Sequence, residues 1–137
     1  SVRSGLSELP AEGLVAVHDG VRPLVSRTLI RRTFEVAEET GAALPACPVT
    51  DSLRLLGEDG GSEAVDRARY RAVQTPQTFD LERLHRAYEQ PFSPQFTDDA
   101  SVYEAAGLGA ITLVEGEETN IKLTTPRDLL LADLLLD

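Results

Sequence analysis

Hydrophobic and polar positions along the chain alternate between short apolar runs and longer amphipathic stretches. Residues 14–18 (LVAVH) and 41–49 (GAALPACPV) are compact apolar runs bounded by turn residues, which is typical of buried strands. Between them, residues 29–40 repeat apolar side chains at mostly helical spacing, and Gly41 follows as a helix-ending glycine. Strands that alternate with helices predict an α/β fold, with substantial parallel content in a sheet covered by helices.

The second half of the chain continues this alternation. Asp80 is the expected N-cap of one helix, and Thr125 followed by Pro126 is a strong start signal for the last one. Helix signals occur at 79–88 and 97–106, a strand signal at 110–114 and an extended segment at 120–124.

A glycine-rich acidic segment interrupts the pattern. Residues 57–63 (GEDGGSE) predict a hairpin tip, and residues 64–73 the return from it. On that return, Arg67, Arg69 and Arg71 stand at every second position, so on a strand they would share one face. Two interpretations stay open. In the first, at least one of the three arginines binds a substrate phosphate. In the second, the stripe is a solvated strand face that guards a sheet edge, and this interpretation is favoured for two of the three arginines.

The charge balance excludes several classes of partner. The 137 residues carry 13 Lys and Arg against 23 Asp and Glu, a formal net charge of −10. Nucleic-acid modules and proteins that bind anionic membranes need basic surface, so neither partner is expected. Cys47 is the only cysteine, which leaves no intrachain disulfide. No apolar run approaches the roughly 20 residues of a membrane span, and no signal peptide is visible, so a cytoplasmic setting is expected.

Polar residues directly follow the first predicted strand, and ligands of such sheets bind beyond the carboxyl ends of the strands. Asp19 is a candidate contact for a ribose hydroxyl or a hydrated metal ion, and Arg22 for a phosphate. The alternative is a local turn closed by an Asp–Arg ion pair. For His18, a histidine that donates to a backbone carbonyl is favoured over a general base.

Lys122 is the strongest single candidate for chemistry. It is the only lysine among the 13 cationic side chains and lies in the extended segment before the last helix. An ammonium group is a flexible point charge suited to stabilising phosphoryl transfer. Residues 97–99 (TDD) open a predicted helix, where a hydroxyl and backbone N–H groups could hold an anion. The alternative is that they only cap the helix, since Asp98 and Asp99 would repel a nearby phosphate.

Several segments, in this order, resemble the signature motifs of one enzyme family. They are residues 17–23 (VHDGVRP), 48–52 (PVTDS), 74–77 (QTPQ), 96–101 (FTDDAS), 114–116 (VEG) and 120–129 (NIKLTTPRDL). The family is that of the 2-C-methyl-D-erythritol 4-phosphate cytidylyltransferases of non-mevalonate isoprenoid biosynthesis. The resemblance extends from residue 1 to the last helix. It implies a Rossmann-like nucleotidyltransferase fold with a mixed, mostly parallel sheet and a protruding β-arm at about residues 48–73.

The resemblance also implies a reaction and a site. Enzymes of the family join CTP and methylerythritol phosphate, releasing pyrophosphate, with Mg²⁺ held mainly through the CTP phosphates. By motif match, Lys122 is a catalytic cation. Asp19 lies by the nucleotide ribose and the substrate hydroxyls, and Arg22 and Thr97 bind methylerythritol phosphate. Ser1 matches a serine placed near the cytosine.

Two further matches imply a homodimer. Ser52 and Arg67 match residues on an arm that crosses to the partner subunit and completes its site. Ser52 stands where threonine is usual, and residues 20–21 (GV) replace a commoner Ala-Ala pair. Neither Arg69 nor Arg71 has such a match.

The family's N-terminal glycine-rich phosphate loop has no counterpart in this sequence. Residues 1–137 are therefore expected to be the C-terminal portion of a single cytidylyltransferase domain. Such a portion should be inactive alone, because that loop cradles the triphosphate. Two other interpretations stay open: a ribitol 5-phosphate cytidylyltransferase, which shares most of the motifs, and a non-catalytic dimerisation fragment. The segments 97–101 and 120–126 favour methylerythritol phosphate over ribitol phosphate.

Overall fold

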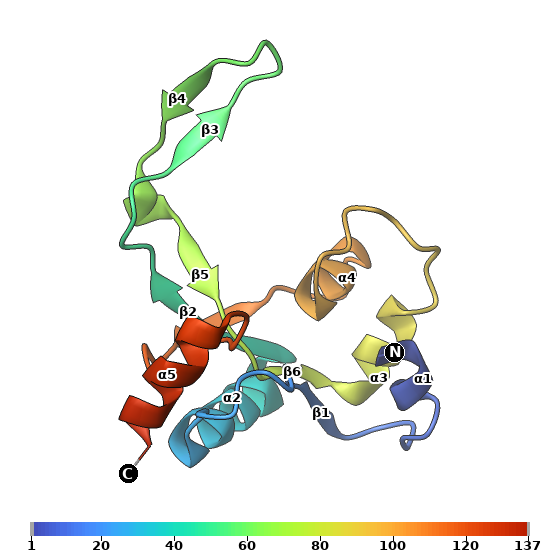
Figure 1. Cartoon of the computed structure of the whole chain (residues 1–137). Helices are drawn as coiled ribbons and strands as arrows, with labels where there is room; N and C mark the ends of the chain where they lie inside the picture. The colour runs from blue at the N-terminus through green and yellow to red at the C-terminus, as the bar shows by residue number, and fades with distance from the viewer. Residues whose placement is uncertain (1, 137) are drawn as a thin grey trace.

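A computed structural model describes residues 2–136, with a central sheet between helices and a long hairpin that projects from it (Figure 1). Strand β1 (Leu14–Val17) leads into helix α2 (Arg27–Thr40) and strand β2 (Ala42–Pro48), as the sequence predicts. The Ser26 side chain caps α2, and Gly41 ends it at φ 97°, a left-handed conformation that glycine adopts without strain.

Strand β2 is the centre of the sheet. On one of its edges it pairs in parallel with β7 (Thr112–Glu115). Along its other edge it pairs in succession with β6 (Gln77–Asp80) and β5 (Arg71–Val73), both antiparallel. The far edge of β6 then pairs with β1, again antiparallel.

The prediction of an α/β fold with a mixed sheet is confirmed, but the prediction of mostly parallel pairing is wrong. Strands β1, β2 and β7 do run in one direction, as alternation with helices predicts. However, β6 lies between β1 and β2 and runs the opposite way. Within residues 2–136, β2–β7 is therefore the one parallel pair. The error arose because residues 77–80 form a strand that sequence analysis assigned partly to a helix.

Helix boundaries follow their caps. Helix α3 (Leu81–Ala87) begins after Asp80, which caps it as predicted, so the expected helix at 79–88 starts two residues late. In α4 (Asp99–Ala105) the N-cap is Asp98 rather than Thr97. Helix α5 (Pro126–Leu135) begins behind Thr125 with proline in its first turn, as predicted.

The core lies on both faces of β2, because alternate residues of a strand point to opposite sides. Ala43 packs with Leu29 and Ala37 of α2. Ala42 packs on the other face, in a cluster that α1 (Val2–Leu6), α3 and α4 cover. The buried members of that cluster are Leu6, Ala42, Phe79, Leu81, Leu84 and Tyr103.

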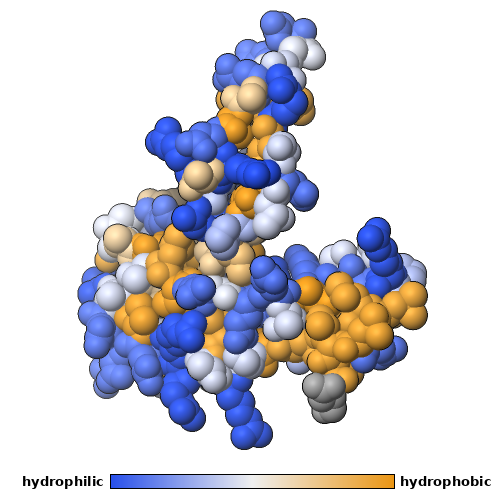
Figure 2. Space-filling view, turned by 90° about the vertical axis from the view of Figure 1, so that its left-hand side faces the viewer, coloured by the Kyte–Doolittle hydropathy of each residue, from blue (hydrophilic) through white to orange (hydrophobic). Residues whose placement is uncertain are grey.

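Helix α5 is apolar on nearly all sides, yet only Ala132 of it is buried. Its leucines form the large apolar surface seen in Figure 2, with Leu130 69% and Leu134 81% exposed. None of the helices between residues 2 and 136 is long and apolar enough to cross a membrane.

The projecting arm contains its own two-stranded sheet, β3 (Arg54–Leu56) paired with β4 (Ser62–Ala64), which confirms the predicted hairpin tip. The prediction of an arginine stripe is wrong. Residues Arg67–Arg69 form a 3-10 turn capped by Asp66, and only Arg71 lies on a strand, β5. The capped turn breaks the two-residue repeat, so the three arginines share no strand face.

Candidate functional site

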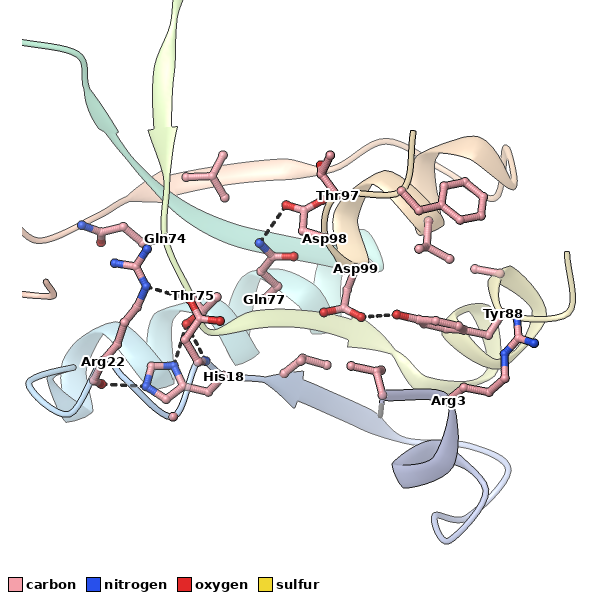
Figure 3. A pocket seen from close by; sticks show the side chains of 18 of the residues that line it. Arg3, His18, Arg22, Gln74, Thr75, Gln77, Tyr88, Thr97, Asp98 and Asp99 are labelled. Atoms are coloured by element: carbon pink, nitrogen blue, oxygen red, sulfur yellow. Dashed lines mark hydrogen bonds and ion pairs between the residues drawn. The ribbon is translucent and has the colours of Figure 1, made fainter. Parts of the chain in front are cut away.

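A cavity of about 790 Å³ opens beyond the end of β1 (Figure 3). Its walls come from the loop after β1, the 74–77 segment, the start of α4 and the segment before α5. Four predicted site residues, Asp19, Arg22, Thr97 and Lys122, line this cavity together. The structure therefore gathers residues that lie more than a hundred positions apart in the sequence.

Asp19 and Arg22 form the ion pair that one interpretation expected, and the pair also lines the cavity. Arg22 Nε lies 3.0 Å from Asp19 Oδ2, and the Arg22 side chain is only 12% exposed. Arg22 Nη1 donates to the backbone carbonyl of Asn120 at 2.8 Å. One guanidinium thus joins the loop after β1 to the segment that carries Lys122.

His18 has the role that the sequence favoured. Its Nε2 lies 2.9 Å from the carbonyl oxygen of Arg22, which can only accept, so Nε2 carries the proton. Its Nδ1 then accepts from Thr75 Oγ1 at 2.9 Å, and that hydroxyl accepts from the backbone N–H of Asp19 at 3.0 Å. This chain of bonds fixes the loop that presents Asp19 and Arg22.

Gln77 holds the start of α4, on which Thr97 depends. It is 3% exposed, its Nε2 donates to Asp98 Oδ2, and its Oε1 accepts from the N–H of Ala100, both at 3.1 Å. The backbone N–H of Thr97 donates to Ser101 Oγ at 2.9 Å within the same capping arrangement. A strand glutamine therefore positions a residue twenty places further along the chain.

The far end of the cavity is lined by aromatic and charged side chains (Figure 3). The Tyr88 hydroxyl donates to Asp99 Oδ1, and the Arg3 guanidinium lies over the Tyr88 ring, 5.9 Å from its centroid. Burial raises the pKa of Tyr88, so the phenol stays protonated. Burial also raises the pKa of Asp99, helped by the Asp98 carboxylate, although the bond from Tyr88 acts in the opposite direction.

The raised pKa of Asp99 makes a prediction about stability. A carboxyl whose pKa is higher in the folded than in the unfolded chain stabilises the fold when protonated, and this contribution is lost as the pH rises through its folded pKa. Asp99→Asn stays neutral and still accepts from Tyr88. Its free energy of unfolding should therefore fall less than that of the parent between about pH 4 and pH 7. Urea unfolding at pH 4 and at pH 7 measures this change, with Asp133→Asn at an exposed position of α5 as control. An equal change in the free energy of unfolding between the two pH values for the parent and for Asp99→Asn would contradict the prediction.

The remaining predicted residues lie elsewhere. Ser52 and Arg67 do not line the cavity; both lie part-way along the arm, between the β2–β5 pair and the β3–β4 hairpin, and Arg67 Nη1 donates there to the Thr50 carbonyl at 2.7 Å. Ser1 lies outside the described residues. Between residues 2 and 136, no three His, Cys, Asp or Glu side chains are grouped as a metal site.

Comparison with known proteins identifies the family to which this fold belongs. The family model described as IspD: 2-C-methyl-D-erythritol 4-phosphate cytidylyltransferase matches residues 1–137. Curated relatives with that name come from Porphyromonas gingivalis, 56% identical, and Bacteroides thetaiotaomicron, 52% identical, each over 99% of this chain. The crystal structure of the Thermus thermophilus enzyme is 40% identical and superposes with a TM-score of 0.83, covering 98% of this chain and 67% of its own.

This chain belongs to the 2-C-methyl-D-erythritol 4-phosphate cytidylyltransferase family. It spans 61% of the length of these two curated cytidylyltransferases. The fold of a family member is thus shown over nearly the whole chain.

Sequence analysis missed several residues that line the cavity of this family member. Gln74, Thr75 and Gln77 belong to a motif that served only to identify the cytidylyltransferase resemblance, and no chemistry was assigned to them. Strand β5 ends at Val73, directly before them, and polar residues that follow a strand were the signal that could have found them. Arg3 and Tyr88 carried no such signal, because they approach each other only when α1 packs beside α3.

Proposed function

We propose that the chain supplies most of the active site of a cytidylyltransferase that acts on CTP and 2-C-methyl-D-erythritol 4-phosphate. A phosphate oxygen of the polyol phosphate attacks the α-phosphorus of CTP, the bond from that phosphorus to the bridging oxygen breaks, and pyrophosphate leaves. One observation carries the proposal: Asp19, Arg22, Thr97 and Lys122 line one cavity at the end of β1. The matching family name supports the identity of the substrates.

The residues of the cavity suit such a transfer because its catalysis consists of positioning and charge stabilisation. Within residues 2–136, Lys122 has no ion-pair partner, so its ammonium is available to the α-phosphoryl oxygens, where charge grows. Arg22 keeps its guanidinium against Asp19 and Asn120 and presents its remaining edge to the substrate phosphate. Thr97 offers a hydroxyl on the opposite wall.

Magnesium enters this proposal with the nucleotide. The described residues form no cluster of three metal-ligating side chains, and Mg²⁺ commonly binds through substrate phosphates with one or two carboxylates. Asp19 is the carboxylate at the strand end that fits this arrangement, since only its Oδ2 is engaged by Arg22. When bound, the ion would neutralise charge on the triphosphate.

Pyrophosphate release tests the proposal directly. The chain spans 61% of its P. gingivalis relative, so the assay uses a chimera in which the part of that relative unmatched by this chain precedes residue 1. This chimera is called the completed enzyme below. We expect it to release pyrophosphate from CTP only when methylerythritol phosphate is present, and the 137-residue chain alone to release none. A folded completed enzyme without turnover would refute the proposed function, and turnover by the chain alone would refute its dependence on the missing part.

Ribitol 5-phosphate is the matched competitor in the same assay. We expect a higher kcat/KM for methylerythritol phosphate than for ribitol 5-phosphate, because the relatives at 52–56% identity bear the methylerythritol name. The reverse order would assign the chain to the ribitol phosphate enzymes.

We further propose that the arm pairs two copies of the chain. An isolated two-stranded hairpin is marginally stable in water, and the arm exposes Leu55 (55%) and Leu56 (80%). Ser52 and Arg67 lie part-way along it, outside the cavity of their own chain. In a dimer with crossed arms, these two residues would enter the cavity of the partner.

Subunit complementation tests this arrangement. Lys122→Ala and Arg67→Ala should each lower the activity of the completed enzyme. After unfolding and refolding together, the mixture should regain up to about a quarter of the parent activity, because half of the dimers are mixed and each mixed dimer has one intact site. Leu55→Asp combined with Leu56→Asp should convert dimer to monomer in sedimentation. A mixture no more active than its components would show that Arg67 does not act across the dimer.

A further inference from the structure

Lys122 lies on a segment with no regular structure to hold it. Residues 116–124 contain no helix or strand, and Lys122 itself is exposed. A lysine side chain is a flexible four-carbon stem, so the direction of its ammonium depends on how firmly its backbone is fixed. Contacts of the neighbouring residues must therefore fix the backbone beside Lys122.

Asn120, two residues before Lys122, is the best-anchored residue of the segment. It is completely buried. Its Nδ2 donates to the Thr75 carbonyl at 2.8 Å and to Gln74 Oε1 at 3.2 Å. Its own carbonyl accepts from Arg22 Nη1 at 2.8 Å, so the side chain and backbone of one residue bind two different walls of the cavity.

The acceptors on which Asn120 depends are themselves fixed. Gln74 Oε1 also accepts from the backbone N–H of Glu117 at 3.2 Å, and Gln74 Nε2 donates to the Glu117 carbonyl at 2.8 Å. A Cβ on Gly116 would lie 2.7 Å from Gln74 Oε1, so only glycine leaves room for this amide. Beyond Asn120, the Leu123 N–H donates to the Val21 carbonyl at 2.8 Å. Lys122 is thus held between two anchored residues.

We infer that Asn120 is a positioning residue that aims the Lys122 ammonium into the cavity through its two Nδ2 hydrogen bonds and its bond to Arg22. The inference rests on the proposed function for its kinetic consequence, but the orientation of Lys122 can be measured without turnover. Asn120 does not line the cavity, so it acts through Lys122 and not by contact with substrate. Aspartate has the same shape, but a carboxylate oxygen would stand in place of Nδ2. That oxygen can only accept, so it would lose both bonds, to the Thr75 carbonyl and to Gln74 Oε1.

Lys122 is the only lysine of the chain, which makes it a single spectroscopic reporter. The 137-residue chain grown with ¹³C-lysine gives one ¹³Cε signal, recorded with and without inorganic pyrophosphate. In the parent we expect the signal to differ from that of the urea-unfolded chain and to shift with pyrophosphate. In Asn120→Asp it should move to the unfolded position and respond at least several-fold less. The matched control is Gln77→Glu, the same amide-to-acid change at a buried residue that holds the other wall.

Kinetics provide the second measurement. In the completed enzyme, Asn120→Asp should lower kcat by about 10- to 100-fold, because displacement of a catalytic group by about 1 Å costs this much, while KM for methylerythritol phosphate stays within about twofold. Gln77→Glu should instead raise that KM, since it loosens Thr97. If circular dichroism shows Asn120→Asp to be unfolded, Gln74→Met replaces it as the test variant. This substitution of a cavity-lining residue removes one Asn120 bond and both Glu117 bonds.

The outcomes separate the two proposals. An Asn120→Asp chain, or its Gln74→Met substitute, with the parent ¹³Cε signal and pyrophosphate response would overturn the positioning role. The positioning role would also be overturned if Gln77→Glu changed the ¹³Cε signal of Lys122 as much as Asn120→Asp does. A completed parent enzyme without turnover would overturn the proposed function, while the ¹³Cε spectra would still decide the role of Asn120.

Discussion

Lys122→Ala should lower kcat of the completed enzyme by about 10²- to 10³-fold, as the loss of one donor to a developing oxyanion does elsewhere. The physical reason is that the α-phosphoryl oxygens gain charge in the transition state, and Lys122 is a cation of the cavity wall that no described carboxylate pairs with. The effect should fall on kcat, because the interaction strengthens only as the charge develops. Single-turnover pyrophosphate release measures it without interference from product dissociation.

Two variants sharpen this result. Lys122→Arg keeps the charge but replaces a compact ammonium with a planar fork, so it should recover only part of the rate. Arg127→Ala removes an exposed cation near the start of α5, outside the cavity, and should leave kcat within about twofold because surface charges act weakly at a distance. A Lys122→Ala enzyme as fast as Arg127→Ala would remove Lys122 from the mechanism.

Residues of the candidate site were predictable from the sequence where charged side chains directly follow a strand. Asp19 and Arg22 follow β1 directly, so a rule about strand ends was enough to select them. Lys122 was selected because it is the only lysine of the sequence and lies before a well-capped helix. The residues that position them were not predictable in this way. Asn120, Gln74 and Gln77 act through bonds between distant segments, and no local periodicity records such pairings.

The fold was predictable to the same extent. The caps at Asp80 and Thr125 were correct because side-chain capping is decided by a few neighbouring residues. The pairing of strands was not, because it depends on where the chain returns. Strand β6 is only four residues long and runs straight into α3, so its one apolar residue, Phe79, was counted with the helix. Without β6, strands β1 and β2 were expected to pair directly and in parallel, whereas each pairs with β6 in antiparallel fashion.

The omitted strand carries the residue whose loss should destabilise the fold most. Phe79 lies in β6 between Val15 of β1 and Ala42 of β2, is fully buried, and its ring centroid is 5.3 Å from that of Tyr103. Phe79→Ala should lower the free energy of unfolding by about 3–5 kcal/mol through lost burial and the cavity left behind. For a domain of this size that corresponds to a fall in Tm of about 10–20 °C, measured by thermal unfolding of the 137-residue chain.

Phe92→Ala is the matched control, because it removes the same side chain from a loop where it is 80% exposed. Its Tm should stay within about 2 °C of the parent, since substitutions on the surface rarely exceed about 0.5 kcal/mol. Equal effects of the two variants would show that β6 does not pack under α3 and α4. In that case the 74–77 segment would also lose its fixed place beside the cavity, and Gln77 would no longer hold the start of α4 that carries Thr97. Stability at Phe79 therefore tests the same strand on which the architecture of the site depends.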